Sequence, residues 1–126
     1  MSNVSFGNHS AIRVPHGLQE RTRQFYRDVL GCEITKKTDD VDYFRMGNNF
    51  FVAVLYEDGA LPEADWLKSI WLEIKADDVL AAKKRILAFG VKEVDSQDKA
   101  HLYFQAPGGQ VFRLVGTEED LSKFER

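Results

Sequence analysis

The sequence is poor in cysteine and in long apolar runs. Its single cysteine, Cys32, cannot form a disulfide within the chain, which favours a reducing compartment such as the cytoplasm. No window approaches the roughly 18 uninterrupted apolar residues that a membrane-spanning helix needs. Residues 1–10 have no basic stretch leading into an apolar run, as a secretion signal would. We therefore expect a cytoplasmic protein with no membrane partner.

The chain also lacks an excess of basic residues. There are 17 Lys and Arg against 20 Asp and Glu, a formal net charge of -3, and the cations are scattered. Nucleic acid binding calls for a basic stripe. The nearest candidate, Lys83-Lys84-Arg85, lies in a helical pattern whose other face is apolar. We interpret it as a solvated helix face and expect no nucleic-acid partner.

Length and apolar content favour a single domain over residues 1–126. Apolar residues make up 44% of the sequence and include nine Phe and two Trp, enough to fill one core. Cys32 follows Gly31 and is interpreted as a packing residue rather than a nucleophile.

The first half of the chain predicts a strand, a helix and three further strands. Residues 9–14 alternate like a half-buried strand, and the helix predicted next ends near Gly31. Three short strands are predicted near residues 32–37, 41–46 and 50–56. The helix pattern is the apolar face formed by Leu18, Thr22, Phe25, Tyr26 and Val29.

The second half predicts the same order of elements. An acidic linker over about residues 57–66 is followed by a strand at 69–74 and a helix capped by Asp77-Asp78, which ends before Gly90. Strands are predicted near 91–95, 101–105 and 110–116, and a short capped helix from Thr117 through Phe124. The two modules span about residues 5–58 and 66–117.

The two halves match when the sequence is shifted by 60 residues. The shift places Tyr43-Phe44 on Tyr103-Phe104 and the turn at residues 47–49 on the turn at 107–109. The predicted fold class is therefore α+β. It has two tandem βαβββ modules related by pseudo-twofold symmetry, forming a cupped, barrel-like mixed sheet with helices outside.

Alternation along the strands predicts which side chains line a pocket between the modules. The larger apolar set of each outer strand should meet a helix, which leaves the other set facing inward. A mixed apolar and charged surface of this kind suits a small organic ligand. Alternatively, Arg13 and Glu73, equivalent under the repeat, form a buried ion pair that fixes how the halves dock. The inward set is His9, Ala11, Arg13, Phe51, Ala53, Leu55, Ser69, Trp71, Glu73, Val111, Arg113 and Val115.

Four segments resemble a known superfamily, the vicinal oxygen chelate proteins, which include glyoxalase I, extradiol dioxygenases and the bleomycin and fosfomycin resistance proteins. The segments are NHSAIRV, FYRDVLGCEI, IWLEIKADDVLAAKKRILAFGV and YFQAPGGQVFRLVG. They span nearly the whole chain and define the fold better than the activity. The resemblance also implies a homodimer.

The resemblance places the superfamily's metal-ligand positions at His9, Ala53, Ser69 and Arg113. Only His9 is a usual ligand, because Ala53 has no donor atom, neutral Ser69 is a poor one and a guanidinium has no lone pair to give. We therefore expect no metal or other cofactor. The alternative is a displaced, weakly bound divalent ion held by His9, Glu73 and waters. His16 and His101 are interpreted as ordinary surface histidines.

The leading interpretation is a metal-independent binding protein of the glyoxalase and bleomycin resistance type. Arg113 beside Trp71 and Phe51 would favour an anionic ligand with a flat apolar or aromatic body, and His9 could donate a hydrogen bond. One alternative is a metal-dependent lyase, isomerase or dioxygenase with a rearranged site. Others are a metal-free acid/base enzyme using His9 and Glu73, or a dimerisation or regulatory module without turnover.

Overall fold

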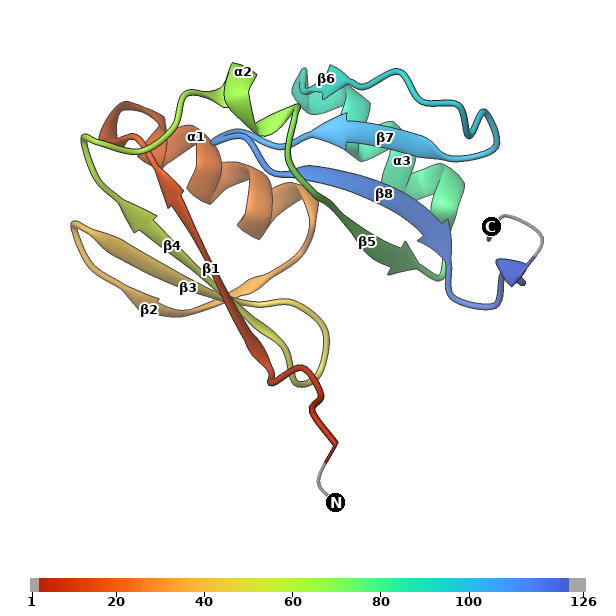
Figure 1. The fold of residues 1–126 in the computed structure, drawn as a ribbon, viewed down its shortest axis with the longest axis horizontal. Coiled ribbons are helices and arrows are strands. Elements are labelled where there is room, and N and C mark those ends of the chain that lie inside the picture. The colour runs from red at the N-terminus through yellow and green to blue at the C-terminus, as the bar shows by residue number, and fades with distance from the viewer. Residues whose placement is uncertain (1–2, 123–126) are drawn as a thin grey trace.

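The chain folds into two four-stranded mixed sheets, one from each half (Figure 1). This is a computed structural model, and it describes residues 3–122. The first sheet has the order β1-β4-β3-β2 and the second β5-β8-β7-β6, with the first and last strands of each module parallel. The strands are β1 (His9–Val14), β2 (Glu33–Lys37), β3 (Val41–Arg45), β4 (Phe51–Tyr56), β5 (Trp71–Ala76), β6 (Lys92–Glu93), β7 (Leu102–Gln105) and β8 (Val111–Gly116).

The predicted α+β class and the two βαβββ modules are confirmed. No strand pair joins the two sheets among the described residues, so they form two separate sheets and not the single barrel-like sheet that was predicted. The predicted strand at 91–95 shortens to β6. The tail helix predicted from Thr117 is wrong over residues 117–121, which form a turn and irregular chain, and its last part through Phe124 lies outside the described residues. Among residues 3–122, no helix has the length and apolar character needed to cross a bilayer.

The helix of each module ends as its sequence predicts. In the second module, the Asp78 side chain accepts a hydrogen bond from the Ala81 N–H at 3.0 Å, and Gly90 has φ 94° at the C-terminal end of α3 (Val79–Phe89). The first helix is less regular and has three parts: η1 (His16–Leu18), α1 (Gln19–Gln24) and the π-helical turn η2 (Phe25–Val29). The linker contains a short helix, α2 (Glu63–Trp66), where only a loop was predicted.

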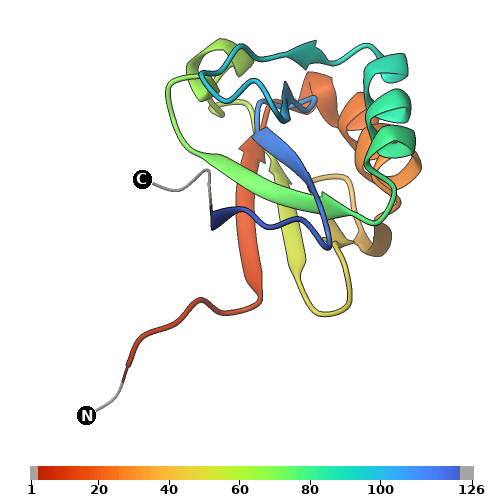
Figure 2. The same ribbon diagram turned by 90° about the vertical axis from the view of Figure 1, so that its right-hand side faces the viewer.

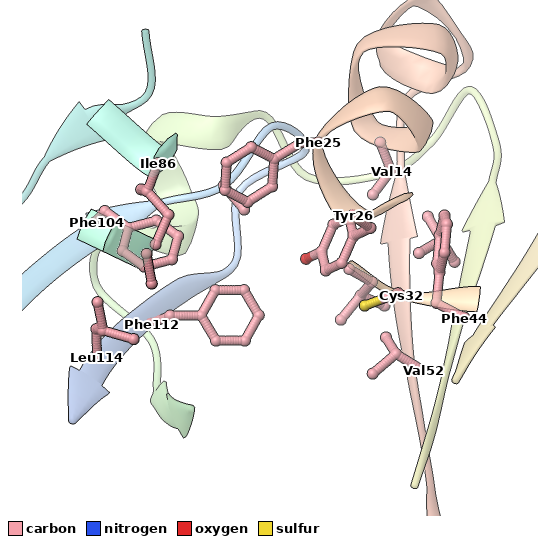
Figure 3. Packing of buried hydrophobic residues seen from close by; sticks show 14 of the residues in the cluster. Val14, Phe25, Tyr26, Cys32, Phe44, Val52, Ile86, Phe104, Phe112 and Leu114 are labelled. Atoms are coloured by element: carbon pink, nitrogen blue, oxygen red, sulfur yellow. The ribbon is translucent and has the colours of Figure 1, made fainter. Parts of the chain in front are cut away.

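One aromatic cluster joins the helices to both sheets. The Tyr26 ring stacks on Phe44 of the first sheet, with centroids 5.1 Å apart, and meets the edge of Phe112 of the second sheet at 6.2 Å (Figure 3). Both main helices lie on the same side of the molecule, where α3 contacts η2 (Figure 2). The helix-facing residues predicted for three of the outer strands are buried: Ile12, Val14, Val52, Val54, Phe112 and Leu114.

The start of β5 differs from its prediction. Alternation assigned Ile70, Leu72 and Ile74 to the helix-facing side, but Ile70 is 61% exposed and Leu72 36% exposed. Only the second half of the strand, from Ile74, packs against the core. Within the described residues, β5 pairs with β8 alone, so its outer edge and its first residues are uncovered.

Strand pairing also corrects the repeat. Tyr43 pairs with Ala53 and Tyr103 with Arg113, so the last two strands of each module keep the 60-residue shift. In the first strands, however, His9 pairs with Phe51, whereas Trp71 pairs with Val111. The shift between β1 and β5 is therefore two residues longer, and Trp71 rather than Ser69 is the counterpart of His9. A two-residue change leaves the side-chain face unaltered.

A buried polar group fixes the first helix to the first sheet. The fully buried Asp42 carboxylate accepts hydrogen bonds from Arg23 Nε at 3.0 Å, Arg23 Nη2 at 3.1 Å and the Tyr56 hydroxyl at 2.8 Å. The bond to Asp42 raises the pKa of Arg23, and burial together with the same carboxylate raises the pKa of Tyr56. The carboxylate therefore compensates a cation and satisfies a hydroxyl in the core.

We expect Asp42→Ala to lower the free energy of unfolding by about 3–5 kcal/mol, because it leaves the Arg23 cation buried without its partner. Urea denaturation followed by circular dichroism measures the loss. The matched control is Asp28→Ala, which breaks the exposed pair with Arg27 (2.7 Å) and should have a much smaller effect. Equal losses for the two variants would contradict this assignment.

Candidate functional site

The helix-free face of the first sheet carries the predicted His9, Phe51 and Arg13. The His9 ring stacks on Phe51 with centroids 5.2 Å apart, and its Nδ1 lies 2.7 Å from Asn8 Oδ1. Arg13 is exposed and pairs with Glu57 at 3.1 Å. The alternative ion pair between Arg13 and Glu73 therefore does not form.

The helix-free face of the second sheet is built around Arg113. Its guanidinium lies 4.5 Å from the centre of the Trp71 ring, and its Nε donates to Glu73 Oε2 at 3.1 Å. Arg113 Nη2 donates to the same carboxylate, and Nη1 lies 3.5 Å from Asp98. Although burial opposes charging, the hydrogen bonds to Glu73 and Tyr103 raise the pKa of Arg113. Two carboxylates, Glu73 and Asp98, thus compensate this cation.

Sequence reasoning missed two members of this group, Tyr103 and Asp98. The Tyr103 ring meets Trp71 edge-on at 5.5 Å, and its hydroxyl donates to Asp98 at 3.1 Å. Alternation could have placed Tyr103 on this face, because it pairs with Arg113 in the sheet. Asp98 lies in the connection between β6 and β7, where no periodicity marks it.

A cavity of about 170 Å³ adjoins this face. Ser69, Trp71 and Val111 are the predicted site residues that line it, and the linker supplies Trp66. Its remaining lining residues are Leu67, Ile70, Val94, Asp95, Ser96 and Tyr103. The lining therefore comes from the linker and the second module, and His9, Arg13 and Phe51 of the first module lie elsewhere.

Trp66 reaches the cavity because the linker docks on the turn between β7 and β8. Gln105 Nε2 donates to the Glu63 carbonyl at 2.7 Å, and the Gly108 N–H donates to the Glu63 carboxylate at 3.0 Å. Gly109 has φ 125°, and a Cβ there would lie 2.3 Å from Trp66 Cδ1. Glycine is thus required both by the backbone and by the indole ring.

The residues at the superfamily's metal positions do not fit a metal. With the corrected register these positions are His9, Ala53, Trp71 and Arg113, and His9 alone offers a usual donor. No group of three or more His, Cys, Asp or Glu within residues 3–122 is placed to hold an ion.

The acid/base alternative finds no support in the contacts of its two residues. Glu73 is engaged by Arg113 on the second sheet, whereas His9 lies on the first sheet beside Asn8.

Cys32 is buried, and burial raises the pKa of its thiol to about 11, which agrees with a packing role.

His101 differs from its prediction as a surface histidine. Its side chain is 4% exposed; Nδ1 lies 2.7 Å from Asp98 Oδ2, and Nε2 contacts the Glu119 carboxylate. Because carboxylates only accept, the doubly protonated ring alone donates to both. Burial favours the neutral ring, but the bonds to Glu119 and Asp98 outweigh it and raise the pKa of His101. His16 is exposed, as predicted, between Asp58 and Asp40.

His101 should make stability depend on pH. Because its pKa is higher in the folded than in the unfolded chain, its contribution is complete below about pH 6.5 and is lost as the pH rises through the folded value. We expect the wild-type free energy of unfolding to fall across this range and the fall to be smaller in His101→Gln. Denaturant titrations at several pH values measure it. His16→Gln, the control for the other histidine with a raised pKa, should retain the His101 part.

No curated protein matches the sequence. A glyoxalase family protein from Bacillus anthracis superposes with a TM-score of 0.70 at 20% identity, covering 90% of this chain and 97% of that one. An antibiotic-binding protein from Streptomyces gives 0.65 at 16% identity, with coverages of 92% and 98%.

A third structure is a variant of a fosfomycin resistance protein from Listeria monocytogenes in complex with Mn(II) and 1S,2S-dihydroxypropylphosphonic acid. It gives a TM-score of 0.69 at 17% identity and covers 98% of this chain and 100% of that one. At these identities the structural matches establish the fold alone. The family model described as Glyoxalase/Bleomycin resistance protein/Dioxygenase superfamily matches residues 8–114. This chain therefore belongs to the glyoxalase/bleomycin resistance protein/dioxygenase superfamily.

Proposed function

We propose that this chain binds a flat, apolar small molecule without the help of a metal ion. The proposal rests on the residues that occupy the four superfamily metal positions. Ala53, Trp71 and Arg113 replace donor atoms with a methyl group, an aromatic ring and a cation. The chemistry that a metal supplies in other members, polarisation of substrate oxygens, therefore has no counterpart among these residues.

The ligand lies against Trp71 and Tyr103 in the cavity next to the second sheet. Both rings line the cavity, and Trp71 is 46% exposed, so its ring is accessible to a flat ligand. Most of the other lining side chains are apolar, and Ser69, Asp95 and Ser96 supply the polar contacts. Such a combination of apolar walls and few polar groups is typical of small-molecule sites.

The contacts of Arg113 change the expected charge of the ligand. The sequence predicts an anionic ligand because it places the Arg113 cation beside Trp71 and Phe51. Glu73 and Asp98 now compensate this guanidinium, and an anion would have to compete with Glu73 for it. We therefore propose that aromatic contact, rather than a negative charge, provides most of the affinity at this face.

The comparisons favour binding over a specific reaction. One structural neighbour is named as an antibiotic-binding protein, and that role requires a pocket but no catalytic group. The fosfomycin resistance protein was captured with Mn(II), a metal for which residues 3–122 of this chain contain no matching ligand set. The residues of this chain therefore suit the role of the antibiotic-binding neighbour better than that of the Mn(II)-bound neighbour.

We further propose that two copies pair in the cytoplasm as a homodimer. β1 and β5 each have a free edge in the described part of the chain, and β5 exposes Leu72, which does not line the ligand cavity. An uncovered strand edge with apolar side chains favours association with a second chain.

Phenol and benzenesulfonate, which share one six-membered ring and differ in charge, test the ligand proposal. Phenol should bind at least as tightly as benzenesulfonate in calorimetry, and chelator treatment should leave both affinities unchanged. Trp71→Ala should weaken binding of phenol by about tenfold, since ring contacts contribute about 1 kcal/mol beyond the area they bury. The control is Leu80→Ala, which truncates an 80% exposed side chain on α3. A stoichiometric transition metal in the purified protein, with loss of binding on its removal, would overturn the proposal.

Sedimentation velocity tests the homodimer. The wild-type protein should sediment as a dimer, and Leu72→Lys, which places a charge at the free edge of β5, should shift it toward monomer. Leu80→Lys places the same charge on an exposed helix position and should leave the dimer intact. A monomeric wild type, or equal effects of the two lysines, counts against the β5 edge as the interface.

A further inference from the structure

A second cavity lies on the helix side of the molecule, where the two modules meet. Its volume is about 150 Å³. The end of η2 and the turn after β3 contribute from the first module, and β5, α3 and β8 contribute from the second. We call it the seam pocket; it is represented here by Leu30, Met46, Ile74, Arg85, Ile86 and Leu114.

The seam pocket is apolar inside and positive in net charge. Ile86 and Leu114 are almost fully buried and form its floor. Lys75 and Arg85 are the charged residues in its lining, which contains no Asp or Glu of the described chain. An anion entering the pocket would therefore meet no opposing carboxylate in the lining.

Arg85 is held at the pocket by the first module. Its Nε donates to the Val29 carbonyl, at the end of η2, with a distance of 3.3 Å. Among the described residues Arg85 forms no ion pair, in contrast to Arg113 and Arg23, which are compensated by carboxylates. Its Nη groups thus remain available to bind a carboxylate in the two-pronged manner that suits a guanidinium.

The π-helical turn accounts for the position of the accepting carbonyl. Leu30 N donates to the Phe25 carbonyl at 3.1 Å, five residues earlier, so the last turn is wider than an α-helical turn. Val29 and Leu30, which end this turn, both line the seam pocket. Wide turns of this type often accompany functional sites.

We propose that the seam pocket binds a small carboxylic acid in its anionic form, with its carboxylate on Arg85 and an apolar body among Leu30, Ile74 and Leu114. The volume limits that body to about one six-membered ring, since a Leu- and Ile-lined cavity of about 150 Å³ accommodates benzene. This site shares no residue with the cavity beside Trp71. It is therefore independent of the function proposed above.

Benzoate and toluene, which share a ring but differ in charge, test the proposal in the full-length protein. Methyl NMR signals of Ile74, Ile86, Leu114 and Met46 should shift saturably with benzoate and much less with toluene. Arg85→Gln should weaken benzoate binding by about tenfold, the usual effect of losing a charge-assisted hydrogen bond. Lys84→Gln, which removes the neighbouring charge outside the pocket lining, should retain wild-type affinity.

Three results would overturn the proposal: no saturable methyl shifts with benzoate, equal affinities for benzoate and toluene, or equal effects of Arg85→Gln and Lys84→Gln. Because Arg85 also bonds to Val29, the methyl spectrum and unfolding midpoint of the unliganded Arg85→Gln variant must match the wild type. If that variant does not fold, the wild-type comparison of benzoate with toluene decides the question.

Discussion

The stack of Tyr26 between the two sheets is the contact on which the rest of the molecule depends. A βαβββ module has one helix and a sheet with two faces, so one face is covered by its own helix. By placing one ring against both Phe44 and Phe112, the chain merges two half-cores into one. The apolar side chains whose burial drives folding therefore lie on the helix side of the two sheets. The opposite faces carry polar and aromatic groups such as Arg113 and Trp71.

Much of this arrangement could be predicted because it follows from local rules. The strand β1 occupies the predicted residues, and Asp78 and Gly90 delimit α3 as their residue types indicate. The burial of Val14 and Val54 follows from alternation. These features depend on neighbours a few residues apart, where periodicity and capping are informative.

What could not be predicted depends on contacts distant in sequence. Alternation is unchanged by a two-residue shift, so no face pattern could distinguish Ser69 from Trp71 as the counterpart of His9. Arg113 was placed on the correct face, but its compensation by Asp98 depends on the path of a loop. For the same reason the sequence does not reveal that His101 bridges that loop and a segment beyond β8.

The docking of Trp66 over Gly109 has a consequence for how the two halves could be exchanged between relatives. The indole ring of Trp66 occupies the space that a side chain at position 109 would fill. The linker helix is therefore packed as part of the second module and is not a flexible connection between the two modules. A chimaera joined after residue 66 would separate the ring from its glycine. A junction before Pro62 would keep α2, the turn between β7 and β8 and the cavity wall in the same half of the chimaera.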